Sequence, residues 1–360
     1  MTLEELSLVG WRNLENASLE PSFGLTVIAG QNAQGKTNLL EAMAAVITGS
    51  SHRALRDEEL IAQGEVRAHL GAQIRRPSGS FEQTLDLVRG GRKERRRQGK
   101  RVVAGADPLG DPLVVLFCPE DLGLVQGGPA GRRRFLDQEA SQATAGYGAA
   151  QRTYQRIWAQ RNTALRRGEG RVVDALDLLW ATAAVRLTVL RRRLIEALAP
   201  LGQEAYAAMA PADPPLTVRL TAGTPSEDPE VALAAIRARR QEEEARRTTV
   251  LGPHRDDISL AIGDNELRAY GSQGQQRTAA VALKLGTVQL LQQASGARPL
   301  LLLDDVLSEL DGRRRELLAQ QVREGQTVIT TTDAEFLPER LQADRWWEIR
   351  SGKVAEHGAP

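Results

Sequence analysis

Two short segments, far apart in the chain, constrain its fold more than any other feature. Residues 30–37 read Gly-Gln-Asn-Ala-Gln-Gly-Lys-Thr and match the phosphate-binding pattern G-x-x-x-x-G-K-[ST]. Apolar residues 25–29 precede this loop and an amphipathic stretch, 36–48, follows it, so we expect a strand, a loop and a helix. Residues 300–305 read Leu-Leu-Leu-Leu-Asp-Asp, which predicts a buried strand that ends in two carboxylates. Together the segments favour an α/β sheet with a nucleotide site at the carboxyl ends of its strands.

The loop chemistry predicts an ATP site. Gly30 and Gly35 permit backbone conformations that a side chain would block, so that the loop amides can wrap phosphates at a helix N-terminus. Lys36 would reach the β- and γ-phosphates, and the Thr37 hydroxyl would bind Mg²⁺. The expected ATP-binding residues are Gly30, Gln31, Asn32, Ala33, Gln34, Gly35, Lys36 and Thr37.

The paired carboxylates after residues 300–303 predict the hydrolytic chemistry. Asp304 would hold Mg²⁺ together with Thr37, directly or through water. Asp305 would polarise the attacking water. We therefore expect Lys36, Asp304 and Asp305 to form the catalytic set, with ATP and Mg²⁺ as cofactors.

A third segment, Ser-Gln-Gly-Gln-Gln at 272–276, opens a helix about 30 residues before the carboxylate-bearing strand. Ser272 can cap this helix, and Gly274 lets a phosphate approach its amides. A simple capping turn is one interpretation. The other interpretation is a second phosphate site, in which the helix faces the ATP of another copy of the chain. The residues expected to contact ATP in trans are Ser272, Gln273, Gly274 and Gln275.

The pattern along the chain predicts two lobes. Residues 1–119 and 248–360 alternate strands and helices and form the expected ATPase lobe, whereas 120–247 is mostly helical. A loop is expected between the strands 81–89 and 101–104, and a helix is expected over 333–341. The sequence contains no long heptad pattern, so we expect no coiled coil. His254 is expected to pack between the lobes rather than to act in catalysis.

Charge is unevenly distributed although the net charge is only +1. Residues 89–101 contain eight basic residues and one acid, and 131–200 contain thirteen arginines and six acids. These segments favour a polyanion-binding surface, although arginine-rich helices also often present solvated faces. The candidate contacts with such a polyanion are Arg95, Arg96, Arg97, Lys100, Arg132, Arg133 and Arg134.

Other sequence features favour a cytoplasmic protein. The single cysteine, Cys118, excludes an internal disulfide and fits a reducing compartment. The N-terminus lacks the basic region of a signal peptide, and no apolar run approaches the roughly 20 residues that span a bilayer. We expect no membrane association.

Several stretches, in this order, resemble the ABC-type ATPase heads and, among them, the RecF family of bacterial DNA-repair proteins. They are residues 11–13, 35–42, 49–53, 119–122, 127–129, 132–137, 251–257, 271–277, 304–306 and 308–311. The resemblance covers nearly the whole chain. It implies an α/β fold, an ABC-type P-loop ATPase head with a mixed sheet and flanking helices, together with a mostly helical second lobe.

The resemblance also implies a function. ATP would close a head-to-head homodimer on gapped DNA or on a single-strand/double-strand junction, and a slow, DNA-stimulated hydrolysis would release it. RecO, RecR and RecA are the implied partners in RecA loading. Residues 308–311 would link the two ATP sites of the dimer.

Two departures from transporter-type heads favour a slow switch over a fast motor. Asp305 stands where those heads have Glu, and Thr330 to Asp333 stand where a His would follow the strand. Gln126 is a candidate for the glutamine that senses the γ-phosphate. The alternatives are the ATPase subunit of a membrane transporter and a chromosome-structural clamp ATPase. The missing His and the missing coiled coil, respectively, argue against them.

Overall fold

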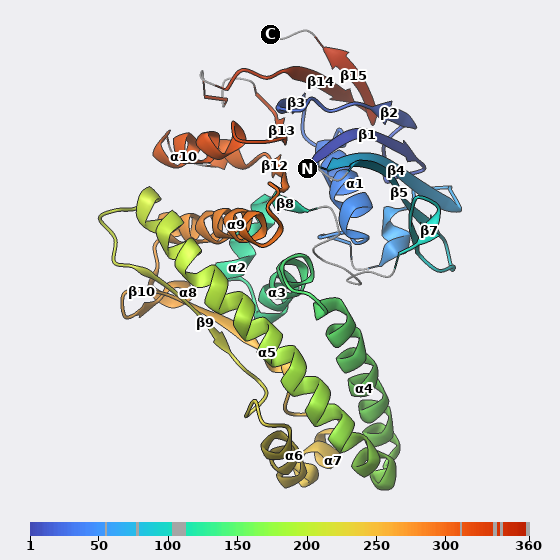
Figure 1. The fold of residues 1–360 in the computed structure, drawn as a ribbon, viewed down its shortest axis with the longest axis vertical. Helices are drawn as coiled ribbons and strands as arrows, with labels where there is room; N and C mark the ends of the chain where they lie inside the picture. Colours follow the sequence, from blue (N-terminus) through green and yellow to red (C-terminus); the bar gives the residue numbers. More distant parts are fainter. Residues whose placement is uncertain are drawn as a thin grey trace. The chain divides into compact units, whose positions relative to one another are not determined.

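The computed structural model of this protein describes residues 1–54, 56–76, 79–102, 113–309, 312–333, 337–338 and 341–357. The described residues form two compact units (Figure 1). One draws on Met1–Ala104, Gly110–Asp121 and Leu291–Pro360, and the other on Gly105–Leu109 and Leu122–Leu290. The first unit contains two sheets and the second contains one.

A six-stranded sheet in the order β15-β14-β3-β13-β12-β8 is the base of the first unit. The five strands from β14 to β8 are parallel, and β15 pairs antiparallel with β14 at one edge. The central strands β3, β13 and β12 are buried along nearly their whole length because both faces of a parallel sheet are covered. The strands are β3 (Leu25–Ala29), β8 (Val114–Phe117), β12 (Leu300–Asp304), β13 (Thr327–Thr331), β14 (Arg345–Arg350) and β15 (Lys353–His357).

A second six-stranded sheet, entirely antiparallel, has the order β2-β1-β4-β5-β6-β7. Its strands are β1 (Thr2–Val9), β2 (Ala17–Leu19), β4 (Arg67–Arg76), β5 (Gly79–Val88), β6 (Glu94–Arg97) and β7 (Lys100–Arg101). The loop expected between the strands 81–89 and 101–104 was wrong, because residues 94–97 pair with β5. Gln98 and Gly99 both have positive φ, 47° and 72°, as the two-residue turn of a tight hairpin requires.

Helix α1 (Lys36–Thr48) packs against strands of both sheets in the first unit (Figure 1). It is apolar almost all round, as a helix covered on several sides must be, and ten of its residues are buried. The other helical segments of this unit are η1 (Asp57–Leu60), η2 (Pro119–Leu122), η4 (Val306–Glu309) and α10 (Gly312–Val322). The helix expected over 333–341 lies largely outside the described residues.

The second unit is built on a long helical hairpin (Figure 1). Helix α4 (Tyr147–Arg167) ends at Gly168, whose left-handed conformation (φ 71°) closes the turn into the 40-residue helix α5 (Gly170–Met209). A three-stranded sheet accompanies it. The remaining elements are α2 (Gly123–Gln126), α3 (Pro129–Ala143), β9 (Leu216–Thr221), α6 (Pro229–Ala238), α7 (Arg240–Arg246), η3 (Pro253–Arg255), β10 (Asp257–Ile262), β11 (Asn265–Glu266), α8 (Leu267–Tyr270) and α9 (Gln273–Ser295).

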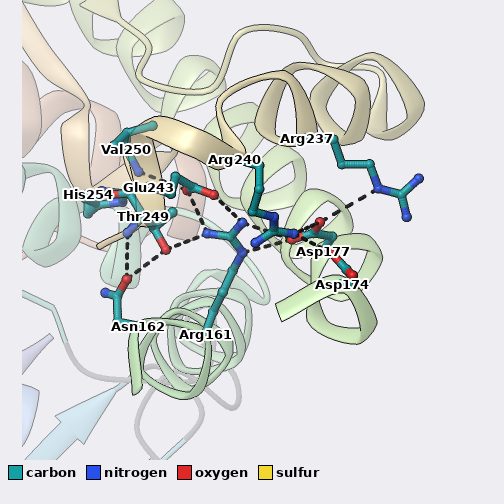
Figure 2. A network of polar contacts seen from close by, with 10 residues as sticks. All are labelled: Arg161, Asn162, Asp174, Asp177, Arg237, Arg240, Glu243, Thr249, Val250 and His254. Atoms are coloured by element: carbon teal, nitrogen blue, oxygen red, sulfur yellow. Dashed lines mark hydrogen bonds and ion pairs between the residues drawn. The ribbon is translucent and has the colours of Figure 1, made fainter. Parts of the chain in front are cut away.

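A buried ionic network ties α4, α5 and α7 together in this unit (Figure 2). The Arg161 guanidinium, with no exposed side-chain surface, contacts Asp177 at 2.9 Å and Glu243 at 2.6 Å. Arg240 contacts Asp177 at 2.8 Å. Thr249 Oγ1 accepts a further hydrogen bond from Arg161 at 2.9 Å. Because each buried charge has an opposite charge beside it, the network holds its helices in one register.

The compact units differ from the expected lobes at one boundary. Residues 248–290 pack with the second unit, although the sequence pattern groups them with the ATPase lobe. Strand β10 explains this packing, since it pairs along its length with β9. The division into an ATPase lobe of 1–119 and 248–360 and a helical lobe of 120–247 stays a prediction. None of the described helices is both long and apolar enough to cross a membrane.

Candidate nucleotide-binding site

The parallel sheet brings the two nucleotide motifs to one edge. Strand β13 lies between β3 and β12, with Thr330 opposite Asp304 on one side and Ile28 on the other. Parallel strands end at the same edge of a sheet, so the loop after β3 and the carboxylates after β12 share that edge. Residues that are about 270 positions apart in the sequence therefore meet within the first unit.

The phosphate loop adopts a backbone that requires its glycines. A Cβ on Gly30 would lie 2.6 Å from the Ile349 carbonyl oxygen. Gly35 has a φ of 117°, and a Cβ there would lie 2.7 Å from Leu14 Cδ2. Ala33 also takes a left-handed conformation, with a φ of 64°. The glycine spacing of the motif thus reflects close approach of neighbouring strands and loops as well as backbone freedom.

The Lys36 side chain is folded back over the loop. Its Nζ donates to the carbonyl oxygens of Gly30 at 2.6 Å and Gln31 at 3.0 Å. Burial lowers the pKa of Lys36, and the nearby Asp305 and Asp304 carboxylates oppose that shift. The ammonium group is held by its hydrogen bonds to the two carbonyl oxygens and by the charges of the two carboxylates. In this position a phosphate oxygen could replace the carbonyl oxygens as its acceptor.

Asp304 is buried at the strand end, with 4% of its surface exposed. Its Oδ1 accepts a 2.7 Å hydrogen bond from Thr330 Oγ1, and the Thr37 hydroxyl also hydrogen-bonds to it. Burial raises the pKa of Asp304, helped by the charges of Glu120 and Asp305, while the hydroxyl hydrogen bonds act against the shift. A nearby cation would favour the ionised carboxylate in this position.

The donor set of Thr37 and Asp304 fits Mg²⁺. Both supply hard oxygen ligands, and their contact places a hydroxyl and a carboxylate side by side. Within the described ranges, no group of three or more His, Cys, Asp or Glu side chains could hold a metal ion. An ion at this edge would therefore depend on phosphate oxygens and water for its remaining ligands, as is usual for Mg²⁺ in nucleotide sites.

Thr330 is a residue of this site whose role the sequence reasoning missed. Its Oγ1 accepts from the Asp305 backbone N–H at 2.9 Å while donating to Asp304. Asp305 itself has a left-handed backbone (φ 52°), an unusual conformation that this hydrogen bond helps to hold. The available signal was the pair of threonines, Thr330 and Thr331, at the carboxyl end of the buried strand β13. One hydroxyl therefore orients both acidic residues.

A buried carboxylate braces the helix that follows the loop. Glu41 accepts two 2.9 Å hydrogen bonds from the Arg12 guanidinium and one of 2.5 Å from Ser51 Oγ. Burial acts to raise the pKa of Glu41, but the hydrogen bonds from Arg12 and Ser51 outweigh it and lower the pKa. Arg53 contacts the same carboxylate at 3.3 Å. These residues belong to the stretches 11–13 and 49–53 that the sequence analysis singled out, and they position the helix rather than line the loop.

The segment 272–275 opens helix α9 with a reciprocal cap in the second unit. The Gln275 N–H donates to Ser272 Oγ at 3.2 Å, and the Ser272 N–H donates to Gln275 Oε1 at 3.0 Å. This is a capping box with Gln in the third helical position. Ser272 and Gln273 are exposed and Gly274 is half-buried. The expected cap is thus present, and the contact with ATP in trans stays a prediction.

Two smaller expectations have different outcomes. Gln126 Nε2 donates to Gln276 Oε1 at 2.8 Å within the second unit, so its side chain is engaged beside the α9 cap. Its role as a γ-phosphate sensor stays a prediction. The other expectation is the loop at 308–311 that would link the two ATP sites of the dimer. Residues 310–311 lie outside the described residues, so this role also stays a prediction.

The basic DNA-contact candidates divide by burial. Arg95 and Arg132 are 6% and 5% exposed, and Arg132 forms a two-pronged ion pair with Asp257 at 2.5 and 2.9 Å. The half-buried members are also engaged: Arg97 lies over the Phe81 ring, and Arg133 donates to the Asp256 carbonyl at 3.0 Å. Buried guanidinium groups cannot reach a DNA phosphate without breaking these contacts. The exposed candidates are Arg96, Lys100 and Arg134.

His254 has structural surroundings in the second unit. It stacks on Tyr154 with ring planes 17° apart, and it lies 5.2 Å from Trp158. Tyr154 Oη lies 2.7 Å from His254 Nδ1, and the Thr249 carbonyl lies 3.0 Å from Nε2. Since a carbonyl can only accept, Nε2 carries the proton. This arrangement fixes one tautomer and leaves no ring nitrogen for catalysis.

Comparison with known proteins places this geometry in a family. A family model described as an AAA domain matches residues 5–142. A DNA replication and repair protein RecF from Symbiobacterium thermophilum is 39% identical, over 98% of this chain and 98% of the relative. This chain belongs to the RecF family. Another RecF, from Synechococcus sp. strain JA-3-3Ab, is 36% identical over 99% of this chain and 98% of the relative.

Solved structures agree with the RecF-family assignment. The recombination mediator protein RecF in the RecFOR pathway, determined with an ATP analogue written ATPrS, matches with a TM-score of 0.90 and 27% identity. The match covers 99% of this chain and 98% of that one. An Smc head domain from Pyrococcus furiosus matches at a TM-score of 0.53 and 17% identity, which is a likeness of fold alone. The expected ABC-type ATPase head is therefore confirmed.

Proposed function

We propose that this RecF-family chain is an ATP-dependent DNA-binding protein of recombinational DNA repair. The observation that carries the proposal is the shared edge at which Lys36, Thr37 and Asp304 meet, with Asp305 beside them. A relative of known structure has been determined with ATP, in agreement with a nucleotide at this edge. ATP hydrolysis is then a slow switch, stimulated by DNA, that times a change of state.

The residues of the loop and the strand end have separate roles in this proposal. The amides of residues 32–37 bind the phosphates, and Lys36 neutralises charge on the β- and γ-phosphates. Thr37 and Asp304 hold Mg²⁺, which supplies charge neutralisation on the phosphate oxygens when bound. Asp305 orients the attacking water and accepts its proton. Thr330 holds the Asp304 carboxylate and the Asp305 backbone in place through the two hydrogen bonds of its hydroxyl.

The second half of each ATP site comes from another copy of the chain. Ser272 and Gln273 are exposed at the start of α9, where the amides and the positive end of the helix favour an anion. Their cap is self-contained, so the segment is preorganised without nucleotide. ATP would thus be buried between the loop of one copy and residues 272–275 of the next, which closes a head-to-head dimer.

The closed dimer grips DNA through exposed basic side chains. The exposed candidates are Arg96 and Lys100 on the β6–β7 hairpin and Arg134 on α3. The proposed substrate is gapped DNA or a single-strand/double-strand junction. The RecFOR pathway of the related protein of known structure supports RecO and RecR as partners. RecA loading is the proposed outcome.

Sedimentation velocity, with and without ATP, tests the dimer. The unchanged chain should shift from monomer to dimer on addition of ATP and Mg²⁺. Lys36→Met should remove ATP binding and the shift, while Lys353→Met, at an exposed lysine on β15, should behave as the unchanged chain. Ser272→Arg should still bind ATP but remain monomeric and inactive. A monomeric Ser272→Arg variant with full ATPase activity would contradict the role in trans.

A further inference from the structure

The C-terminal end of α1 is capped by a side chain from the antiparallel sheet. The last carbonyl groups of a helix lack partners inside the helix. Gly49 N–H donates to the Ala45 carbonyl at 2.8 Å, and Gln83 Nε2 donates to the Val46 and Ile47 carbonyls, the latter at 3.1 Å. Gln83 lies in the middle of β5 and is fully buried. One amide group therefore fixes the end of α1 to the sheet.

The other half of the Gln83 amide binds the β6 strand of the basic hairpin. Its Oε1 accepts from Arg95 Nη2 at 3.1 Å and from Arg97 Nη2 at 3.3 Å. Arg95 also packs against the turn after α1, because a Cβ on Gly49 would lie 3.1 Å from Arg95 Cδ. Positive charge beside a helix C-terminus is favourable. A continuous chain of hydrogen bonds thus runs from α1 through Gln83 to β6.

The opposite face of the same strand is exposed. Strand alternation places Arg96 on the face opposite Arg95 and Arg97, and it is exposed together with Lys100 and Arg101. Glu94 pairs with Arg96 at 3.0 Å and is the one acid in residues 94–101, against five basic side chains. The hairpin therefore presents positive charge to the solvent while its inner face holds Gln83.

The other end of α1 is the phosphate loop. Lys36 and Thr37 are its first two residues, and the helix of 13 residues spans about 20 Å at 1.5 Å per residue. Its buried side chains pack tightly, and a packed helix moves as a unit rather than bending freely. Any displacement of the loop end on nucleotide binding must be accommodated by the hydrogen bonds of Gln83 at the far end.

We infer that Gln83 and Arg95 are positioning residues that couple nucleotide binding at the phosphate loop to polyanion binding at the β6–β7 hairpin. The inference rests on the proposed function and adds the route by which DNA and ATP act on one another. All of its parts lie within the first compact unit. Because coupling between two sites is reciprocal, DNA changes the affinity for ATP by the same factor by which ATP changes the affinity for DNA.

Nucleotide affinity measured with and without DNA tests the coupling. The probes are a fluorescent ATP analogue with Mg²⁺ and a 30-base-pair duplex at saturating concentration, and the measured quantity is the ratio of the two Kd values. In the unchanged chain we expect the ratio to differ from one by about fivefold or more. Gln83→Met, which keeps the length of the side chain but removes both amide contacts, should bring the ratio close to one.

A matched variant separates coupling from a general disturbance of the sheet. Gln73→Met makes the same change in the neighbouring strand β4. Gln73 pairs with Glu82, so its side chain lies on the face opposite Gln83. This variant should keep the ratio of the unchanged chain. If Gln83→Met does not fold, Arg95→Lys serves instead, since it keeps the charge but loses the forked guanidinium. This variant should bring the ratio of the two Kd values at least twofold closer to one.

The outcomes distinguish this inference from the function on which it rests. A folded chain that binds ATP but no duplex would overturn both. A chain that binds both ligands with a ratio of one would overturn the coupling alone. So would a Gln83→Met or Arg95→Lys variant that keeps the full ratio. The double change Arg96→Glu and Lys100→Glu should weaken duplex binding at least tenfold, and unchanged binding would remove the hairpin from the coupling.

Discussion

Thr330 Oγ1 donates a 2.7 Å hydrogen bond to Asp304 Oδ1 across two neighbouring parallel strands, and the same oxygen accepts from the Asp305 N–H at 2.9 Å. The hydroxyl therefore orients the carboxylate assigned to Mg²⁺ and the backbone of the residue assigned to the attacking water.

Thr330→Val should slow ATP hydrolysis without abolishing nucleotide binding. The change keeps the shape of the side chain but removes a hydrogen bond to a charged group, worth about 1.5–3 kcal/mol, so kcat should fall about 10- to 100-fold. Nucleotide Kd should stay within about threefold. Thr327→Val is the control, since Thr327 lies at the other end of β13 and donates to the Val322 carbonyl. Equal effects of the two variants would contradict the role of Thr330.

Asp305→Asn should trap the ATP-bound dimer. Loss of a general base typically slows a reaction about 10²- to 10⁴-fold, while the backbone N–H that binds Thr330 is retained. We expect ATP-driven dimerisation in sedimentation velocity to be preserved and the dimer to persist after ATP is added in limited amount. Turnover within tenfold of the unchanged chain would show that another group activates the water.

Arg161→Met should destabilise the second unit strongly. It would leave the fully buried Asp177 and Glu243 carboxylates without their shared cation, although Arg240 still contacts Asp177 (Figure 2). Breaking a buried pair in this way costs about 3–5 kcal/mol. Arg237→Met is the matched control, because Arg237 is mostly exposed, lies 3.7 Å from Asp177, and should cost less than about 1 kcal/mol. Urea unfolding measures both, and equal losses would contradict the assignment.

His254 should make stability depend on pH on the acidic side of neutrality. Burial lowers the pKa of His254 to about 4, with the charges of Arg255 and Arg133 acting in the same direction. The unfolded chain, with a His pKa near 6.5, takes up the proton first as the pH falls, so stability is complete above about pH 6.5 and is lost toward pH 4. The contribution between pH 7 and pH 5 is about 2 kcal/mol.

Urea unfolding at pH 7 and pH 5 checks this dependence. His254→Gln should lower stability at pH 7 and remove about 2 kcal/mol of the difference between the two pH values. His357→Gln, at an exposed position near the end of β15, should leave the difference unchanged. A pH difference that is the same in His254→Gln as in the unchanged chain would assign it to other groups.

Much of the architecture is readable in the sequence because it depends on local patterns. The strand, glycine loop and helix at 25–48, the helical hairpin closed at Gly168, and the Ser272 cap of α9 all form where residue types and spacing predict them. The β6–β7 hairpin was missed because its inward residues are arginines, which do not show the apolar alternation of a half-buried strand.

The sequence by itself determined the glycine-rich loop at 30–37, the two carboxylates at 304–305 and the family, because each depends on short runs of residues in fixed order. Only the tertiary structure decided which side chains meet: Thr330 with Asp304, Gln83 with Arg95, and Arg132 with Asp257. The last two pairs bury Arg95 and Arg132, whose contact with DNA stays a prediction. The physical reason is that such pairing depends on the register between separate segments, and that register is set by packing the whole chain.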